Sequence, residues 1–167
     1  NEKEASRFPD RIRLTLSRFF REKDRWEAPY SLALLWRDEL ERKYSGRRIS
    51  VIATDIDEPS LQRASEARYE FPSLREILNE MRQRWFHRDE GHFRLDVKVK
   101  ELVRFEKRNL FDGGPERGMD LVLCRYFVFT YYRGARRRAA VQKLWESTRP
   151  GGLLMIGRKE GLTREDR

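Results

Sequence analysis

The sequence contains little cysteine and histidine and no long apolar run, and each of these absences excludes a class of protein. A single cysteine cannot form an intramolecular disulfide, and two distant histidines provide no cluster of zinc ligands. No apolar stretch approaches the roughly 18–20 residues that cross a bilayer, and the first residues lack the apolar core of a signal peptide. We therefore expect a soluble, cytoplasmic protein with no membrane span and no bound metal.

Familiar catalytic motifs are also missing from the chain. There is no G-x-S-x-G elbow of a serine hydrolase and no phosphate-binding P-loop. His87 and His92 are interpreted as surface or lid contacts, and Cys124 lies within the apolar run MDLVLCRYFVF, where a small buried thiol is common. None of these three residues is an obvious nucleophile or general base.

Positive charge is abundant: the formal net charge is +9 and the pI is near 10.0. The most basic stretch is YRGARRRAAVQK, residues 132–143. One interpretation is a solvated helix start whose arginine stems cover apolar neighbours. The other is contact with an acidic surface or a nucleic acid.

Apolar runs alternate with amphipathic segments along the chain. Continuous β-branched runs predict strands buried on both faces of a parallel sheet, and the expected strands are 48–57, 101–110, 119–129 and 153–158. One helix is expected after Asp57, which can cap it, with Pro59 in its first turn. A second helix is expected over 134–148 and is closed by RPGG. This pattern predicts one α/β domain over residues 1–167, an open and mostly parallel sheet with helices on both faces. Residues 69–100 are expected to form a small inserted subdomain.

Polar residues at the predicted strand ends are the first candidates for a ligand site, because open α/β sheets bind ligands beyond the carboxyl ends of their strands. The carboxylate of Asp55 can accept hydrogen bonds from both hydroxyls of a ribose, or it can instead cap the next helix. Asn109 can offer its amide to an adenine edge or simply close a turn. Tyr126 and Phe127 can cover a base or fill the core.

Six blocks of the sequence together resemble a known family. They are LTLSRFFRE, EAPYSLALLW, VIATDID, RNLFD, DLVLCRYFVF and RPGGLLMIG, in that order, between Leu14 and Leu162. This order is similar to that of the CheR family, S-adenosylmethionine-dependent methyltransferases that methylate glutamates of chemotaxis receptors. The resemblance implies a Rossmann-like class I methyltransferase fold, S-adenosylmethionine as cofactor with S-adenosylhomocysteine as product, and an acidic protein or peptide substrate.

The resemblance also implies a set of cofactor-binding residues: Thr15, Ser17, Arg21, Glu27, Asp55, Asn109, Leu110, Tyr126 and Phe127. Glu27 matches an acid on the methionine side of the pocket, and Asp55 matches the ribose ligand. Asn109 and Leu110 match the pair beside the adenine. Arg21 is the expected catalytic residue, a cation that holds the acceptor carboxylate; without the resemblance, a surface salt bridge to Glu22 or Asp24 would be preferred.

Three departures from the family leave other functions open. Tyr126 stands where the family has asparagine, the family's GHSE is here GRKE at residues 157–160, and the helical N-terminal domain is absent from this sequence. The expected activity is O-methylation of a protein glutamate. The alternatives are a catalytically silent cofactor-binding regulatory module, or a methyltransferase for RNA or a small molecule.

A fourth departure lies between Trp26 and Glu27. In the family, a buried strand and a glycine-rich loop precede the block that begins at Glu27, and that strand lies at the centre of the sheet. This sequence has neither at that position. We therefore expect a segment of roughly 25–30 residues, judged by family spacing, to be absent there.

Overall fold

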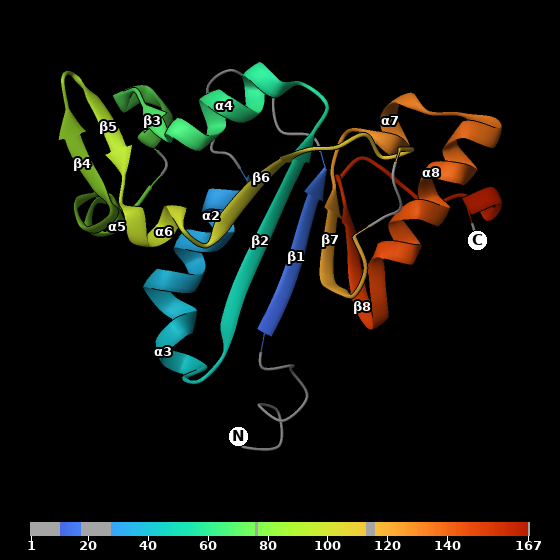
Figure 1. The fold of residues 1–167 in the computed structure, drawn as a ribbon, viewed down its shortest axis with the longest axis horizontal. Helices are drawn as coiled ribbons and strands as arrows, with labels where there is room; N and C mark the ends of the chain where they lie inside the picture. Colours follow the sequence, from blue (N-terminus) through green and yellow to red (C-terminus); the bar gives the residue numbers. More distant parts are fainter. Residues whose placement is uncertain (1–10, 18–27, 76, 113–115, 167) are drawn as a thin grey trace.

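A computed structural model describes residues 11–17, 28–75, 77–112 and 116–166, with residues 11–17 described by their backbone. Five of its strands form one parallel sheet in the order β6-β2-β1-β7-β8. These are β1 (Arg11–Ser17), β2 (Arg48–Asp55), β6 (Val103–Lys107), β7 (Met119–Cys124) and β8 (Thr148–Ile156). Figure 1 shows β1 and β2 side by side, with both arrowheads pointing to the upper edge.

The central strand of this sheet is β1, which pairs in parallel with β2 on one side and β7 on the other. The expectation that the chain lacks a central strand is therefore wrong. The segment RIRLTLS alternates apolar and polar residues with the period of a strand, so the pattern itself is suited to this place. Residues 18–27 are outside the described part of the chain, so the expected omission between Trp26 and Glu27 stays a prediction.

Helices cover both faces of the sheet, as predicted. On one face, α8 (Gly134–Ser147) and α7 (Val128–Tyr131) bury their apolar side chains against Ile52 and Val122. On the other, α2 (Ala28–Leu35) runs through the π-helical turn η1 (Trp36–Leu40) into α3 (Glu41–Lys43), and Trp36 packs with Val51 and Leu123. Because successive strand residues point to opposite faces, neighbouring residues of β2 and β7 serve the two cores.

A second, antiparallel sheet in the order β3-β5-β4 lies on the β6 side of the molecule, opposite α7 and α8 (Figure 1). It comprises β3 (Arg68–Tyr69), β4 (Phe86–Asp89) and β5 (His92–Leu95), and the neighbouring helical elements are η2 (Phe71–Leu74), α5 (Asn79–Trp85) and α6 (Val97–Lys100). The run HFRLDVKV, residues 92–99, alternates apolar and polar residues in the way typical of an exposed strand, but only its first half, β5, is one. Asp96 accepts a hydrogen bond from the backbone N–H of Lys98 and starts α6.

Two predicted boundaries of the main sheet are corrected. The strand expected over 119–129 ends at Cys124, and residues 128–131 are helical. The RPGG segment belongs to β8 and does not separate it from α8. The register of β8 against β7 shifts between Met119 and Leu121, and Gly151, with a φ of 77°, allows the chain to turn within that bulge. The cap of α4 (Glu58–Glu66) agrees with the prediction: Asp57 accepts a hydrogen bond from the N–H of Ser60, with Pro59 in the first turn.

Candidate cofactor-binding site

The chain reverses its direction of travel across the sheet at β1. From β1 it moves outward through β2 to β6, and it then crosses back to build β7 and β8 on the other side. Such a switch point opens a crevice at the carboxyl ends of the two diverging strands, here β1 and β7. The candidate site is this edge of the sheet, where β2, β1, β7 and β8 all end.

Asp55 is the last residue of β2 and only 8% of its surface is exposed. Its Oδ1 accepts a hydrogen bond of 3.0 Å from the backbone N–H of Asp57. The alternative role, capping α4, belongs to Asp57, and hydrogen bonding from Ser60 lowers the pKa of Asp57. Asp55 is thus a buried carboxylate at the end of a parallel strand and does not cap the helix.

Asn109 follows β6 and closes a turn. Its amide oxygen accepts from the N–H of Phe111 at 3.1 Å, and its amide nitrogen donates to Asp112 at 2.8 Å. Leu110 packs against the apolar cluster beneath α7 and α8. The structure therefore shows the turn-forming role of Asn109, and contact with an adenine stays a prediction for both residues.

Tyr126 and Phe127 follow β7 and differ in their surroundings. The ring of Tyr126 is 39% exposed, and its backbone φ of 52° is left-handed. The guanidinium of Arg125 lies 5.6 Å from the centre of that ring. Phe127 is half-buried and meets Tyr132 edge to face at 5.2 Å. Phe127 fills the core, whereas Tyr126 lies at the open edge of the sheet.

Glu160 is a residue of this edge that the sequence reasoning did not single out. Its Oε2 accepts from the backbone N–H groups of Tyr126 and Gly157, both at 2.7 Å, and its Oε1 accepts from the hydroxyl of Thr130 at 2.6 Å. The carboxylate thereby ties the loop after β8 to the turn after β7. The only sequence signal was that GRKE keeps the first and last residues of the family's GHSE.

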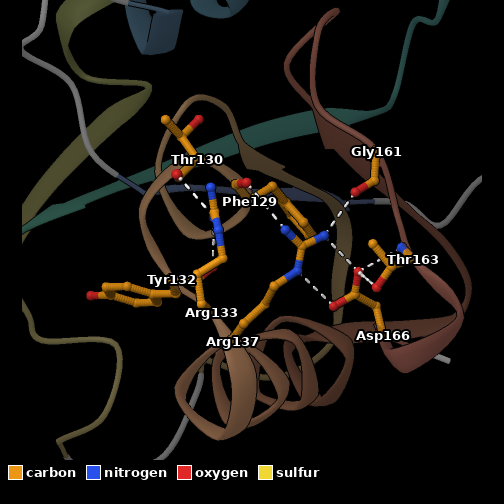
Figure 2. A network of polar contacts seen from close by, with 8 residues as sticks. All are labelled: Phe129, Thr130, Tyr132, Arg133, Arg137, Gly161, Thr163 and Asp166. Carbon is orange, nitrogen blue, oxygen red and sulfur yellow. Dashed lines mark hydrogen bonds and ion pairs between the residues drawn. The ribbon is translucent and has the colours of Figure 1, made fainter.

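Arg137 of α8 fixes the far end of the same loop (Figure 2). It donates to the carbonyl oxygens of Gly161 at 2.8 Å and Phe129 at 3.2 Å, and it binds both carboxylate oxygens of Asp166 at 2.8 and 2.6 Å. Asp166 also accepts from the N–H and hydroxyl of Thr163. Hydrogen bonding from Arg137 holds the pKa of Asp166 far below its ordinary value.

The remaining sequence-predicted residues are only partly placed. In the strand register, Ser17 at the end of β1 lies beside Thr54, one residue before Asp55. Thr15 lies two residues deeper in the sheet, opposite Ile52 and Val122. Arg21 and Glu27 are outside the described residues. Ser17 and Asp55 therefore end the neighbouring strands β1 and β2, and Tyr126 follows the end of β7 on the other side of β1. Asn109 lies one strand further out, beyond β2.

This architecture is that of the Rossmann-like class I methyltransferases. Among solved structures, a TehB-like S-adenosylmethionine-dependent methyltransferase from Corynebacterium glutamicum matches with a TM-score of 0.50 and 12% identity, over 99% of this chain and 65% of that one. An identity this low shows the fold alone. In the part of the chain that the structure describes, no helix is long and apolar enough to cross a membrane.

The family follows from the sequence comparisons. The family described as "CheR methyltransferase, SAM binding domain" matches residues 25–167, and the chain belongs to this family. Its relatives include a chemotaxis protein methyltransferase of Listeria monocytogenes, 28% identical over 89% of this chain and 66% of the relative. One from Vibrio parahaemolyticus is 33% identical over 82% of this chain and 51% of the relative. The chain thus spans about half to two thirds of the length of these relatives.

The Listeria relative has positions that this chain lacks. The alignment of the two is 178 positions long, but it covers only 89% of the 167 residues here, about 149 residues. About 29 positions of the relative therefore have no counterpart in this chain. The omission expected between Trp26 and Glu27 stays a prediction.

The polar residues at the sheet edge fit the family's cofactor, S-adenosylmethionine. A nucleoside needs an acceptor for its ribose hydroxyls at the end of the second strand, and Asp55 provides a buried carboxylate there. The turn at Asn109 lies one strand further out, after β6, where the resemblance to the family predicts the adenine. Among the described residues, no group of histidine, cysteine, aspartate and glutamate side chains could hold a metal ion.

Proposed function

We propose that this chain binds S-adenosylmethionine at the carboxyl edge of its sheet and methylates a carboxylate of an acidic protein. The observation that carries the proposal is the buried carboxylate of Asp55, next to the switch point of a CheR-family fold. The chemotaxis relatives support a glutamate side chain as acceptor, by family membership.

The chemistry demands little of the protein beyond positioning. When bound, S-adenosylmethionine would supply a methyl group whose transfer to an acceptor oxygen leaves S-adenosylhomocysteine. A carboxylate with a pKa near 4 is already ionised at neutral pH, so no general base is required. Asp55 would hold the ribose, and the β7 and β8 loops would shape the edge and limit the access of water. Arg21 remains our candidate for the cation that holds the acceptor.

Unpaired positive charge near this edge supports an acidic substrate. Among the described residues, five exposed cations of the loops after β7 and β8 and the start of α8 have no carboxylate partner: Arg125, Arg133, Arg136, Arg158 and Lys159. Arg133 instead donates to backbone carbonyl oxygens of Thr130 and Tyr132, and Arg136 lies 5.0 Å from the centre of the Tyr132 ring. Such groups attract and orient a negatively charged partner.

Calorimetry with S-adenosylhomocysteine tests cofactor binding directly. The wild-type chain is expected to bind, and Asp55→Asn is expected to weaken binding about tenfold or more, because an uncharged amide accepts hydrogen bonds from two hydroxyls less well. Glu146→Gln is the control: it neutralises an exposed carboxylate of α8 that meets Gln142 and none of the proposed cofactor-binding residues. Absence of binding by the intact wild-type chain would contradict the proposal.

Methyl transfer needs its own assay. Cell extract is incubated with the chain and radiolabelled S-adenosylmethionine, and labelled proteins are then treated with mild base. We expect label on acidic proteins, with release by base as methanol, because carboxylate methyl esters are labile to base. Label that resists base, or that is found on RNA, would contradict a carboxylate acceptor.

One observation favours a second candidate, a catalytically silent cofactor-binding module. Tyr126 replaces the asparagine of the family, and the amide of Asn109 is already engaged within its own turn. Binding of S-adenosylhomocysteine without transfer to any protein, peptide or RNA would favour this candidate, and measurable turnover would exclude it.

A further inference from the structure

The turn after β7 has a backbone conformation that its sequence does not favour. Three described residues other than glycine have a positive φ: Ala67, Glu90 and Tyr126. Ala67 ends α4 in the left-handed conformation usual for a helix C-cap, and Glu90 precedes Gly91 in the tight turn between β4 and β5. Tyr126, at 52°, has neither context. A bulky side chain rarely adopts this region, so the surrounding structure must hold it there.

Glu160 provides that support from a distant part of the sequence. One of its carboxylate oxygens accepts the N–H of Tyr126 at 2.7 Å and also the N–H of Gly157 at 2.7 Å, while the other accepts the hydroxyl of Thr130 at 2.6 Å. The N–H of Glu160 in turn donates to the carbonyl oxygen of Gly157 at 2.9 Å. Hydrogen bonds to a carboxylate are about twice as strong as those between neutral groups.

The packing beside this carboxylate leaves no room for a side chain at residue 157. Gly157 is buried, and a Cβ atom there would lie 2.6 Å from the Glu160 carboxylate and 2.8 Å from the Tyr126 ring. The ring of Tyr126 therefore rests directly on the backbone of residue 157. Arg137 fixes the other end of the loop through the carbonyl oxygen of Gly161.

We propose that Glu160 is a positioning residue of the cofactor-binding edge, which acts by holding Tyr126 in its left-handed turn beside the central strand. The inference rests on the proposed function, because it assigns Glu160 to the same site. The Glu160 carboxylate is engaged by protein donors, the N–H groups of Tyr126 and Gly157 and the hydroxyl of Thr130. It fixes where the backbone and ring of Tyr126 stand at the end of β7, and the family resemblance places a cofactor contact at that position.

The first test compares cofactor binding in two Glu→Gln variants. Glu160→Gln retains shape but offers one acceptor oxygen for three donors, so S-adenosylhomocysteine binding measured by calorimetry should weaken about tenfold. Glu146→Gln on the exposed side of α8, where the carboxylate meets only Gln142, is the matched control and should bind like wild type. Both are measured well below their melting temperatures, so that a purely structural loss does not alter the affinity.

A milder variant covers the case in which Glu160→Gln does not fold. Thr130→Val removes one donor and leaves both backbone contacts to the carboxylate, so it should fold and weaken binding by a smaller factor, about threefold. Unchanged binding in Thr130→Val and in folded Glu160→Gln would overturn the inference. Absence of binding by the wild-type chain would instead refute the proposed function, and this inference with it.

A double-mutant cycle separates action through Tyr126 from a general structural role. Asparagine adopts the left-handed region more readily than tyrosine, so a Tyr126→Asn chain depends less on Glu160. Glu160→Gln should therefore cost about tenfold in affinity with tyrosine at 126 and threefold or less with asparagine there. Equal losses in the two backgrounds would show that Glu160 acts independently of the turn and would overturn the proposal.

Discussion

The ion pair between Arg137 and Asp166 is a strong test of how this part of the molecule is held together (Figure 2). The side chains are 12% and 1% exposed, and two short hydrogen bonds join them. Removing one partner of a buried pair typically costs 3–5 kcal/mol, because the other charge is left without compensation. Arg137 would keep its bonds to Phe129 and Gly161, so we expect Asp166→Asn to lower the free energy of unfolding by about 3 kcal/mol, the lower end of that range.

The pH dependence supplies a second, independent signature. The pKa of Asp166 is lowered in the folded protein, so its stabilisation is fully present above the ordinary value of 3.8 and is lost progressively as the pH falls below it. At pH 3 the unfolded chain has largely taken up this proton and the folded chain has not. The gap between wild type and Asp166→Asn should therefore shrink by about 1 kcal/mol between pH 5 and pH 3.

Urea denaturation at several pH values measures both quantities. Glu58→Gln is the matched control, because Glu58 pairs with Lys107 through exposed side chains, 69% and 59% accessible, and such pairs contribute little. A loss below 1 kcal/mol for Asp166→Asn, or a gap that stays constant between pH 5 and pH 3, would refute the view that this pair is a buried, charge-dependent anchor.

Three further predictions concern other parts of the fold. Gly152→Ala should lower the free energy of unfolding by about 2 kcal/mol in urea denaturation, because its Cβ would lie 2.9 Å from the backbone oxygen of Met119; full wild-type stability would contradict the packing of the β8 bulge. Asp57→Ala should lower the free energy of unfolding by less than Asp166→Asn in the same denaturation, because losing a helix cap typically costs about 1 kcal/mol, less than breaking a buried ion pair. If the unpaired cations bind an acidic protein, retention of the chain on a heparin column should disappear at modest salt. Retention at high salt would instead favour a nucleic acid as the partner.

Most of the sheet could be predicted because its strands have a strong local signal. Strands β2 and β7 are apolar runs buried on both faces, and the cap at Asp57 has the usual sequence of a helix start. The central strand was missed for a different reason. Its alternating pattern is visible in residues 11–17, but the family resemblance places this segment on the approach to the cofactor, so the two signals point to different roles for it.

The site was harder to predict because its internal contacts join residues that are distant in sequence. The end of β2 identified Asp55, since position at a strand end is a local property. The bond from Tyr126 to Glu160 spans 34 residues, and nothing in the sequence near either residue indicates it. A turn at Asn109 and an adenine contact are both compatible with the local sequence, and the hydrogen bonds to Phe111 and Asp112 show the turn.

The departures from the family can be understood together once these contacts are considered. The network at this edge depends on the carboxylate of Glu160, on the small size of Gly157 and on the backbone N–H of residue 126, which most residue types can provide. The first two are the residues that GRKE shares with the family motif. The changes fall on the side chain of Tyr126 and on Arg158 and Lys159, which are exposed. The framework of the edge is thus retained while the exposed groups that it presents have changed, which favours an intact cofactor-binding edge over a collapsed one.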